Sequence, residues 1–264
     1  SMKKYLVAGN PIKHSLSPIL HNYWIKKYNI NAIYEKHRLN ENDIESLILK
    51  VKKKSLNGIN VTVPFKKSVI PFLDQLSFEA TNTQSVNTIY LNKDKLVGHN
   101  TDIDGLRTSM KNLKSYITNK KILILGAGGV VPSIIYVLNE MKASGIIISN
   151  RTKKKAENLK NYFKNLKIIE WGDVPEFDMV INATSIGLNK KDQINLDFSK
   201  VGKNKLFYDV IYNHSETNFL KKGKELGNKI ENGKLMFIYQ ASSAFCLWHN
   251  VQPIVNNEII KLLD

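Results

Sequence analysis

The chain has 264 residues, of which 42% are hydrophobic, and it carries a formal net charge of +16. This length and composition allow two modest domains with their own cores. No apolar stretch approaches the ~20 residues that span a bilayer. The lysines are scattered, without a basic tail, zinc-ligand spacing or an RNA-binding aromatic motif. We therefore expect no nucleic-acid or membrane partner, and the charge favours anionic small molecules.

Cysteine usage and the first residues favour a reducing compartment. Cys246 is the only cysteine, so no internal disulfide can form. Residues 2–8 run directly into Gly9 without the pattern of a secretory signal. We expect a cytoplasmic location. The oligomeric state stays open, with a homodimer as one option.

The first part of the chain alternates between strand and helix patterns. Short apolar runs bounded by turn residues predict strands, and longer amphipathic stretches predict helices. The predicted strands cover residues 4–8, 32–37, 58–63 and 88–91, and the predicted helices cover 17–28, 42–54 and 67–73.

The second part repeats the alternation with more continuous apolar strands. These lie at 121–125, 146–149, 166–170, 179–183 and 206–210, separated by helical stretches. Such strands favour a parallel sheet covered by helices on both faces. A helix is expected to start near Asp104, and residues 239–263 are expected to be helical. The predicted fold class is α/β, with two α/β domains flanking a cleft, the usual place for a ligand.

A glycine turn follows the strand at 121–125. Gly126, Ala127, Gly128 and Gly129 form it, and a helix pattern comes next. Glycines let the backbone approach a pyrophosphate, which then lies on the helix N-terminus. The third glycine of the usual pattern is replaced by Val131, so an ordinary tight turn is the alternative interpretation.

Arg151 indicates which dinucleotide would bind. It lies after the next predicted strand, where NAD enzymes usually carry an acidic residue for the ribose 2′-hydroxyl, and Lys153, Lys154 and Lys155 follow it. A cation at this place suits a 2′-phosphate, so the pattern favours NADP over NAD.

Four polar segments stand out in the first part, at 9–18, 60–66, 85–88 and 98–102, and three of them directly follow or interrupt a predicted strand. Loops at strand ends gather ligands in open α/β sheets. Single residues have structural explanations: Ser17 before Pro18 suits a helix N-cap, Asn87 suits a turn, and Lys66 could be a solvated lysine. Together the segments suit a small hydroxylated anion.

These motifs resemble the shikimate dehydrogenase family over essentially the whole chain. The resemblance continues through 126–129, 150–152, 182–187, 209–212 and 240–241. It implies a reversible NADP-dependent reduction of 3-dehydroshikimate to shikimate, a step in chorismate and aromatic amino-acid biosynthesis. It also implies a substrate-binding domain of residues 1–103 plus 239–264, and a Rossmann-like NADP-binding domain of residues 104–238.

The resemblance assigns roles position by position. Lys66 and Asp102 match the catalytic pair. Substrate-binding positions are Ser15, Ser17 and Tyr212 for the carboxylate and Thr62, Lys66, Asn87, Asp102 and Gln240 for the ring hydroxyls. Cofactor-binding positions are Gly126, Ala127, Gly128, Gly129, Val130, Asn150, Arg151, Thr152, Lys155, Thr184, Ser185, Val210 and Met236. Core packing explains Val210 and Met236 equally well.

The chemistry of these side chains agrees with the roles. A lysine beside an aspartate can exchange the hydroxyl proton and stabilise alkoxide charge, while the aspartate orients both groups. Which of the two is the formal base stays open because their titrations would be coupled. No metal site is expected, since no His/Cys cluster has ligand spacing.

Two positions depart from the family pattern. Leu235 replaces a glycine in the stretch before the C-terminal helix, which puts cofactor geometry in question, and His214 replaces the usual proline after Asn213. Two alternative functions remain: a quinate/shikimate dehydrogenase that uses NAD or both cofactors, and a regulatory relative that binds the ligand without turnover.

Overall fold

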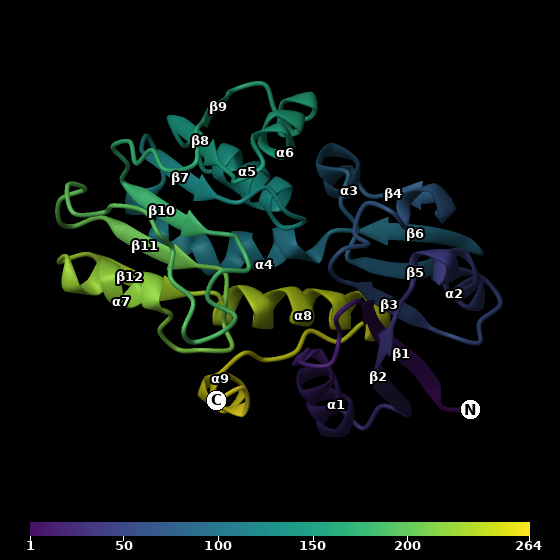
Figure 1. Cartoon of the computed structure of the whole chain (residues 1–264). Coiled ribbons are helices and arrows are strands. Elements are labelled where there is room, and N and C mark those ends of the chain that lie inside the picture. The colour runs from purple at the N-terminus through teal and green to yellow at the C-terminus, as the bar shows by residue number, and fades with distance from the viewer. The chain divides into compact units, whose positions relative to one another are not determined.

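The computed structural model describes all 264 residues, and they form two compact units (Figure 1). The first unit contains residues 1–105 and 238–264, and the second contains residues 106–237. The chain leaves the first unit within helix α4 (Thr101–Met110) and returns within helix α8 (Lys234–His249). No helix combines the length and the apolar composition that a bilayer crossing requires.

A mixed six-stranded sheet forms the centre of the first unit, in the order β2-β1-β3-β5-β6-β4. Strand β1 runs parallel to β2 and β3, whereas β5 is antiparallel to both β3 and β6. The strands are β1 (Lys3–Gly9), β2 (Ala32–Arg38), β3 (Gly58–Val61), β4 (Gln75–Leu76), β5 (Thr88–Asn92) and β6 (Lys95–His99). The helices are α1 (Ser17–Lys27), α2 (Ile44–Lys52), α3 (Phe78–Thr83) and α9 (Asn257–Leu262), together with parts of α4 and α8.

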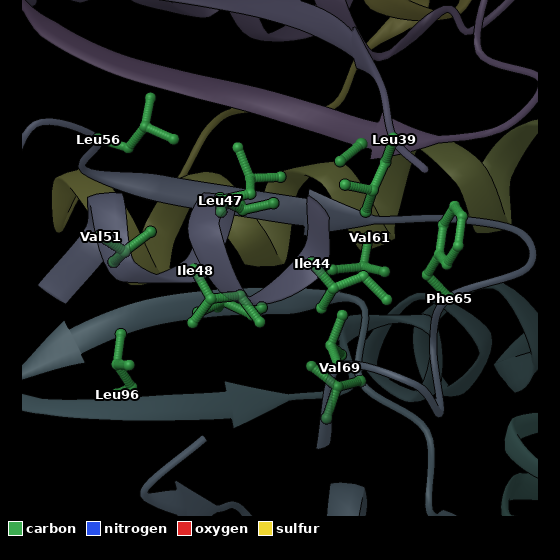
Figure 2. Close-up of a cluster of buried hydrophobic side chains, with 14 of the residues drawn as sticks. Leu39, Ile44, Leu47, Ile48, Val51, Leu56, Val61, Phe65, Val69 and Leu96 are labelled. Atoms are coloured by element: carbon green, nitrogen blue, oxygen red, sulfur yellow. The ribbon is translucent and has the colours of Figure 1, made fainter. Parts of the chain in front are cut away.

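Successive side chains of the central strands point to opposite faces of this sheet. Leu6 of β1 belongs to a buried cluster on one face. Ile48 of α2 and Val61 of β3 belong to the same cluster (Figure 2). Tyr5, the neighbour of Leu6, contacts Trp248 of α8 on the other face. This period of two is what a strand with both faces covered requires.

The second unit is built on six parallel strands in the order β12-β11-β10-β7-β8-β9. The chain starts at the centre with β7 and moves outward, then returns to the other side of β7 with β10. The strands are β7 (Lys121–Leu125), β8 (Gly145–Ser149), β9 (Leu166–Ile169), β10 (Met179–Asn182), β11 (Leu206–Asp209) and β12 (Lys229–Asn232). The connecting helices are α5 (Val131–Glu140), α6 (Lys153–Asn158) and α7 (Asn218–Glu225). This is the Rossmann strand order, whose switch point lies between β7 and β10.

The α/β fold class and the predicted strands are confirmed, with shifts of a few residues at their ends. The predicted helix at 67–73 is wrong: only a 3-10 turn at Ile70–Phe72 forms, because Pro71 has no N–H to donate and disfavours helix at the residue before it. The C-terminal stretch is two helices, α8 and α9, rather than one. Strands β4, β6 and β12 were not predicted. Strand β6 pairs with β5 through a tight hairpin in which Lys93 and Asp94 adopt positive φ.

Candidate active site

A lysine and an aspartate from different elements meet in the first unit. Lys66, on the loop after β3, donates from Nζ to Oδ2 of Asp102 at 2.7 Å. Both side chains are largely buried, with exposures of 13% and 8%. The alternative interpretation of Lys66 as an ordinary solvated lysine is therefore wrong.

Backbone contacts and a helix start hold this pair in place. The carbonyl of Lys66 accepts a bond from the N–H of Val86 at 2.8 Å, which ties the loop to the strand region that follows. Asp102 lies in the first turn of α4, where the helix dipole stabilises a carboxylate. Asn100 accepts from the N–H of Ile103 with its Oδ1, which satisfies a donor that the helix start leaves open.

Asn87 joins the strand β5 to the start of α4. Its Nδ2 donates to the hydroxyl of Thr101 at 2.9 Å, and its Oδ1 accepts from the Thr101 N–H at 2.7 Å. The Asn87 side chain is buried, and Thr101 is the residue next to Asp102. Asn87 thus positions Asp102 through α4, a contact that its turn-like sequence context did not reveal.

Two further candidate residues of the first unit, Ser15 and Ser17, lie at the start of α1. The Oγ of Ser15 accepts from the N–H of Ser17 at 3.3 Å. The N-cap residue is Leu16, without a side-chain cap bond, so the interpretation of Ser17 as the helix cap is wrong. The hydroxyl of Ser17 makes no hydrogen bond within the chain, although the residue is buried.

Three more candidate residues lie on other elements. Thr62 is half-buried on the loop after β3, and Gln240 is half-buried on α8. Tyr212 belongs to the second unit, on the loop after β11, and its ring stacks on Phe237 with centroids 4.1 Å apart.

The glycine turn of the second unit provides open space beside backbone. Gly126 has φ +115°, and a Cβ there would lie 2.9 Å from the carbonyl oxygen of Ala183. Gly126 is therefore required both by its conformation and by the close approach of the loop after β10. A Cβ on Gly128 would meet no heavy atom within 4 Å, so the space above the turn is open. Helix α5 begins after Val130 without a side-chain cap.

The loop after β8 carries exposed cations. Arg151, Thr152 and Lys155 are exposed, and Asn150 donates from Nδ2 to the carbonyl of Thr152 at 2.9 Å. The guanidinium carbon of Arg151 lies 5.6 Å from the ring centroid of Trp171.

A buried polar cluster supports the loop after β10, and the sequence did not predict it. Asp209 accepts from the hydroxyl of Thr217 at 2.6 Å, and from Nδ2 of Asn182 at 3.1 Å. Asn182 in turn accepts from the N–H and hydroxyl of Thr184 with its Oδ1. Burial raises the pKa of Asp209 to about 6, against the opposing effect of these hydrogen bonds. The cluster fixes Thr184, and with it the loop carrying Ser185.

The residues at the start of α8 explain why Leu235 can replace the glycine of the family pattern. A Cβ on Gly233 would lie 2.0 Å from the carbonyl oxygen of Val210, so no larger residue fits there without a shift. Leu235 lies in the first turn of α8, where a helical conformation suits a leucine. Met236 is buried. The close approach to Val210 therefore depends on Gly233 and not on residue 235.

The strand order, the switch point and the glycine turn define the class: a protein with a Rossmann-type dinucleotide-binding unit. Comparison with known proteins is more specific. A family model described as the shikimate dehydrogenase substrate binding domain matches residues 7–89, and one described as shikimate / quinate 5-dehydrogenase matches residues 108–209. The chain belongs to the shikimate dehydrogenase family.

Relatives and solved structures agree with the family models over the full length. The chain is 56% identical over 262 residues to the shikimate dehydrogenase (NADP(+)) of Pelagibacter ubique, and the match covers 99% of both. It is similar to a crystal structure of shikimate dehydrogenase from Aquifex aeolicus, with a TM-score of 0.88, 34% identity and 99% and 97% of the two chains covered. A shikimate dehydrogenase crystallised with NADP+ gives a TM-score of 0.90 at 32% identity, over 99% and 94% of the chains.

Proposed function

We propose that this protein catalyses the reversible, NADP-dependent reduction of 3-dehydroshikimate to shikimate, in the route to chorismate and the aromatic amino acids. The match to an NADP(+) shikimate dehydrogenase over 99% of the chain supports this function. The buried contact between Lys66 and Asp102 carries the proposal, because a ligand-binding relative without turnover has no need of it.

The two units suit two tasks. We assign residues 1–103 and 239–264 to substrate binding and residues 104–238 to NADP binding, close to the compact units that divide at 105 and 237. In the first, Ser15 and Ser17 would donate to the substrate carboxylate, with Tyr212 of the second as a further donor. Thr62, Asn87 and Gln240 would surround the ring hydroxyls together with Lys66 and Asp102.

The reaction needs a proton at the substrate oxygen. Bound NADPH would supply the hydride for the carbonyl carbon of the substrate. Lys66 gives one N–H to Asp102, which leaves its other N–H groups for the substrate oxygen. In the reducing direction the Lys66 ammonium transfers a proton to that oxygen, and Asp102 keeps the amine oriented.

The second unit has the features that a dinucleotide requires. The open space at Gly128, beside the uncapped start of α5, suits a pyrophosphate. Gly126, Ala127, Gly129 and Val130 complete that turn. Arg151, with Asn150, Thr152 and Lys155, would hold the ribose 2′-phosphate, and Thr184, Ser185, Val210 and Met236 would line the nicotinamide end.

A quinate dehydrogenase that uses NAD is not favoured, since relatives with 34–56% identity carry the name shikimate dehydrogenase (NADP(+)). The test is to follow NADPH formation with shikimate against quinate, and with NADP against NAD. We expect the highest kcat/KM for shikimate with NADP. A higher value for quinate, or for NAD, would contradict the proposal, and binding of shikimate without turnover would support the regulatory alternative.

Further properties accompany this function. A single cysteine supports a cytoplasmic location, which cell fractionation would test. We propose a small molecule as the substrate and no nucleic-acid partner. A homodimer is the oligomeric state to test, by light scattering of the purified protein.

A further inference from the structure

Arg151 and Trp171 occupy equivalent places on the loops that follow two neighbouring strands. Ser149 of β8 pairs in register with Ile169 of β9. Arg151 lies two positions after Ser149, and Trp171 lies two positions after Ile169. The strands run parallel, so the loops that carry Arg151 and Trp171 leave the same edge of the sheet. The guanidinium carbon lies 5.6 Å from the indole centroid, within the range of a cation–π interaction.

The indole of Trp171 packs against the hydrophobic core of the second unit. It is half-buried and packs against a cluster that includes Leu125 of β7, Ile147 of β8 and Phe177. A side chain held by the core on one side and touched by an arginine on the other is a rigid platform. Arg151 itself is exposed, and a free arginine side chain would lose much rotamer freedom on binding a ligand.

The neighbouring cation, Lys153, is paired with a carboxylate, whereas Arg151 is not. Glu170, next to Trp171, accepts from Nζ of Lys153 at 2.6 Å, and its carboxylate compensates the lysine charge. Arg151 has no carboxylate partner and no hydrogen bond within the chain. An aromatic face orients a guanidinium without occupying its five N–H donors and without a carboxylate that would neutralise its charge, so both stay available for an anion.

We propose that Trp171 is a positioning residue that presents Arg151 to the ribose 2′-phosphate, and thereby a determinant of the preference for NADP over NAD. This inference rests on the proposed function, which assigns the 2′-phosphate to Arg151. It adds a residue that touches the cofactor only through Arg151.

The test measures binding of adenosine 2′,5′-bisphosphate by calorimetry on the full chain. This probe carries the 2′-phosphate and lacks the nicotinamide, so it reports binding without turnover. Trp171→Leu keeps an apolar side chain without an aromatic face, and Trp171→Phe keeps the face. An exposed cation–π contact corresponds to a change of about 2- to 5-fold in affinity. We expect Trp171→Leu to weaken the probe by that factor and Trp171→Phe to stay near wild type.

Two controls separate positioning from packing. Ile194→Ala removes a side chain that packs against the same cluster, and it should leave the affinity for the probe unchanged. In an Arg151→Ala background, Trp171→Leu should have no further effect, because the interaction it removes is already gone. The KM for NAD should not change in any Trp171 variant. Trp171→Met, a flexible side chain of similar reach, carries the test if the leucine variant does not fold.

Equal affinities of wild type, Trp171→Leu and Trp171→Met for the probe would overturn the inference. So would an equal loss in Trp171→Phe, or a loss that persists without Arg151. The proposed function fails separately, if wild type shows no preference for NADP. An unchanged affinity of Arg151→Ala for the probe would instead remove Arg151, and Trp171 with it, from the 2′-phosphate site.

Discussion

Lys66 Nζ and Asp102 Oδ2 lie 2.7 Å apart, although 36 residues separate them in the sequence. The loop after β3 carries the lysine and the first turn of α4 carries the aspartate. Removing one partner of such a pair leaves the other charge largely buried without compensation. The two residues are therefore expected to act, and to fail, as a unit.

Lys66→Ala should lower kcat by about 10²- to 10⁴-fold, the typical contribution of a positioned acid or base. Shikimate binding should weaken far less. Asp102→Asn should also lower turnover, and the double variant should lose less than the product of the two single losses. Steady-state kinetics and equilibrium binding of shikimate are the measurements. Wild-type kcat in a folded Lys66→Ala protein would contradict the proposed role of Lys66 in proton transfer.

Arg151→Ala should weaken NADP by ~1.5–3 kcal/mol through loss of a charge-assisted contact and leave NAD nearly unchanged. The kcat/KM values for both cofactors measure this. An equal loss for NADP and NAD would mean that Arg151 does not contact the 2′-phosphate.

Ser15→Ala and Ser17→Ala should raise the KM for shikimate more than they lower kcat, because a carboxylate contact lies away from the reacting carbon. Ser17 should show this clearly, since its hydroxyl has no partner within the chain. Thermal unfolding is the control. Normal KM in both variants would remove the serines from the substrate site.

Gly233→Ala should destabilise the protein by about 1–3 kcal/mol, because the new Cβ overpacks the site. That atom would lie 2.0 Å from the Val210 carbonyl oxygen, so the KM for NADP should also rise. Leu235→Gly is the contrast: it should cost about 1 kcal/mol of helix stability and leave the KM nearly unchanged. The reverse pattern would place residue 235, and not 233, beside the cofactor.

The titration of Asp209 makes a prediction for stability against pH. Burial raises its pKa in the folded protein to about 6, from an ordinary value of 3.8. Between these values the folded chain holds a proton that the unfolded chain has lost, so the free energy of unfolding falls as pH rises through this window. The change is on the order of 3 kcal/mol and is complete above the folded pKa.

Asp209→Asn should remove this dependence of stability on pH. The measurement is the difference in urea-unfolding free energy between wild type and variant, taken at several pH values between the two pKa values. The difference is needed because His21 acts with the opposite sign. Burial lowers the pKa of His21 to about 3, so its contribution to stability is lost as pH falls below 6.5. A difference that stays constant with pH would show that Asp209 is ionised throughout.

Local patterns were enough to predict most of the fold, whereas the roles of the candidate residues came from the resemblance to the family. Apolar runs indicated most strands of both sheets, and Gly126 marked the turn after β7, because strand period and glycine conformation are properties of short segments. The helix predicted at 67–73 does not form, because Pro71 lacks an N–H and restricts the backbone of the residue before it.

What the sequence by itself determined is therefore the alternation of elements and the residue types placed at their ends. Tertiary structure alone decided which of those residues meet. Lys66 is buried against Asp102, Trp171 lies against Arg151, and Asp209 gathers Asn182 and Thr217, each through contacts between separate segments. The physical reason is that burial and hydrogen-bond partners depend on how strands are ordered in a sheet, and strand order is set by packing of the whole chain rather than by any one segment.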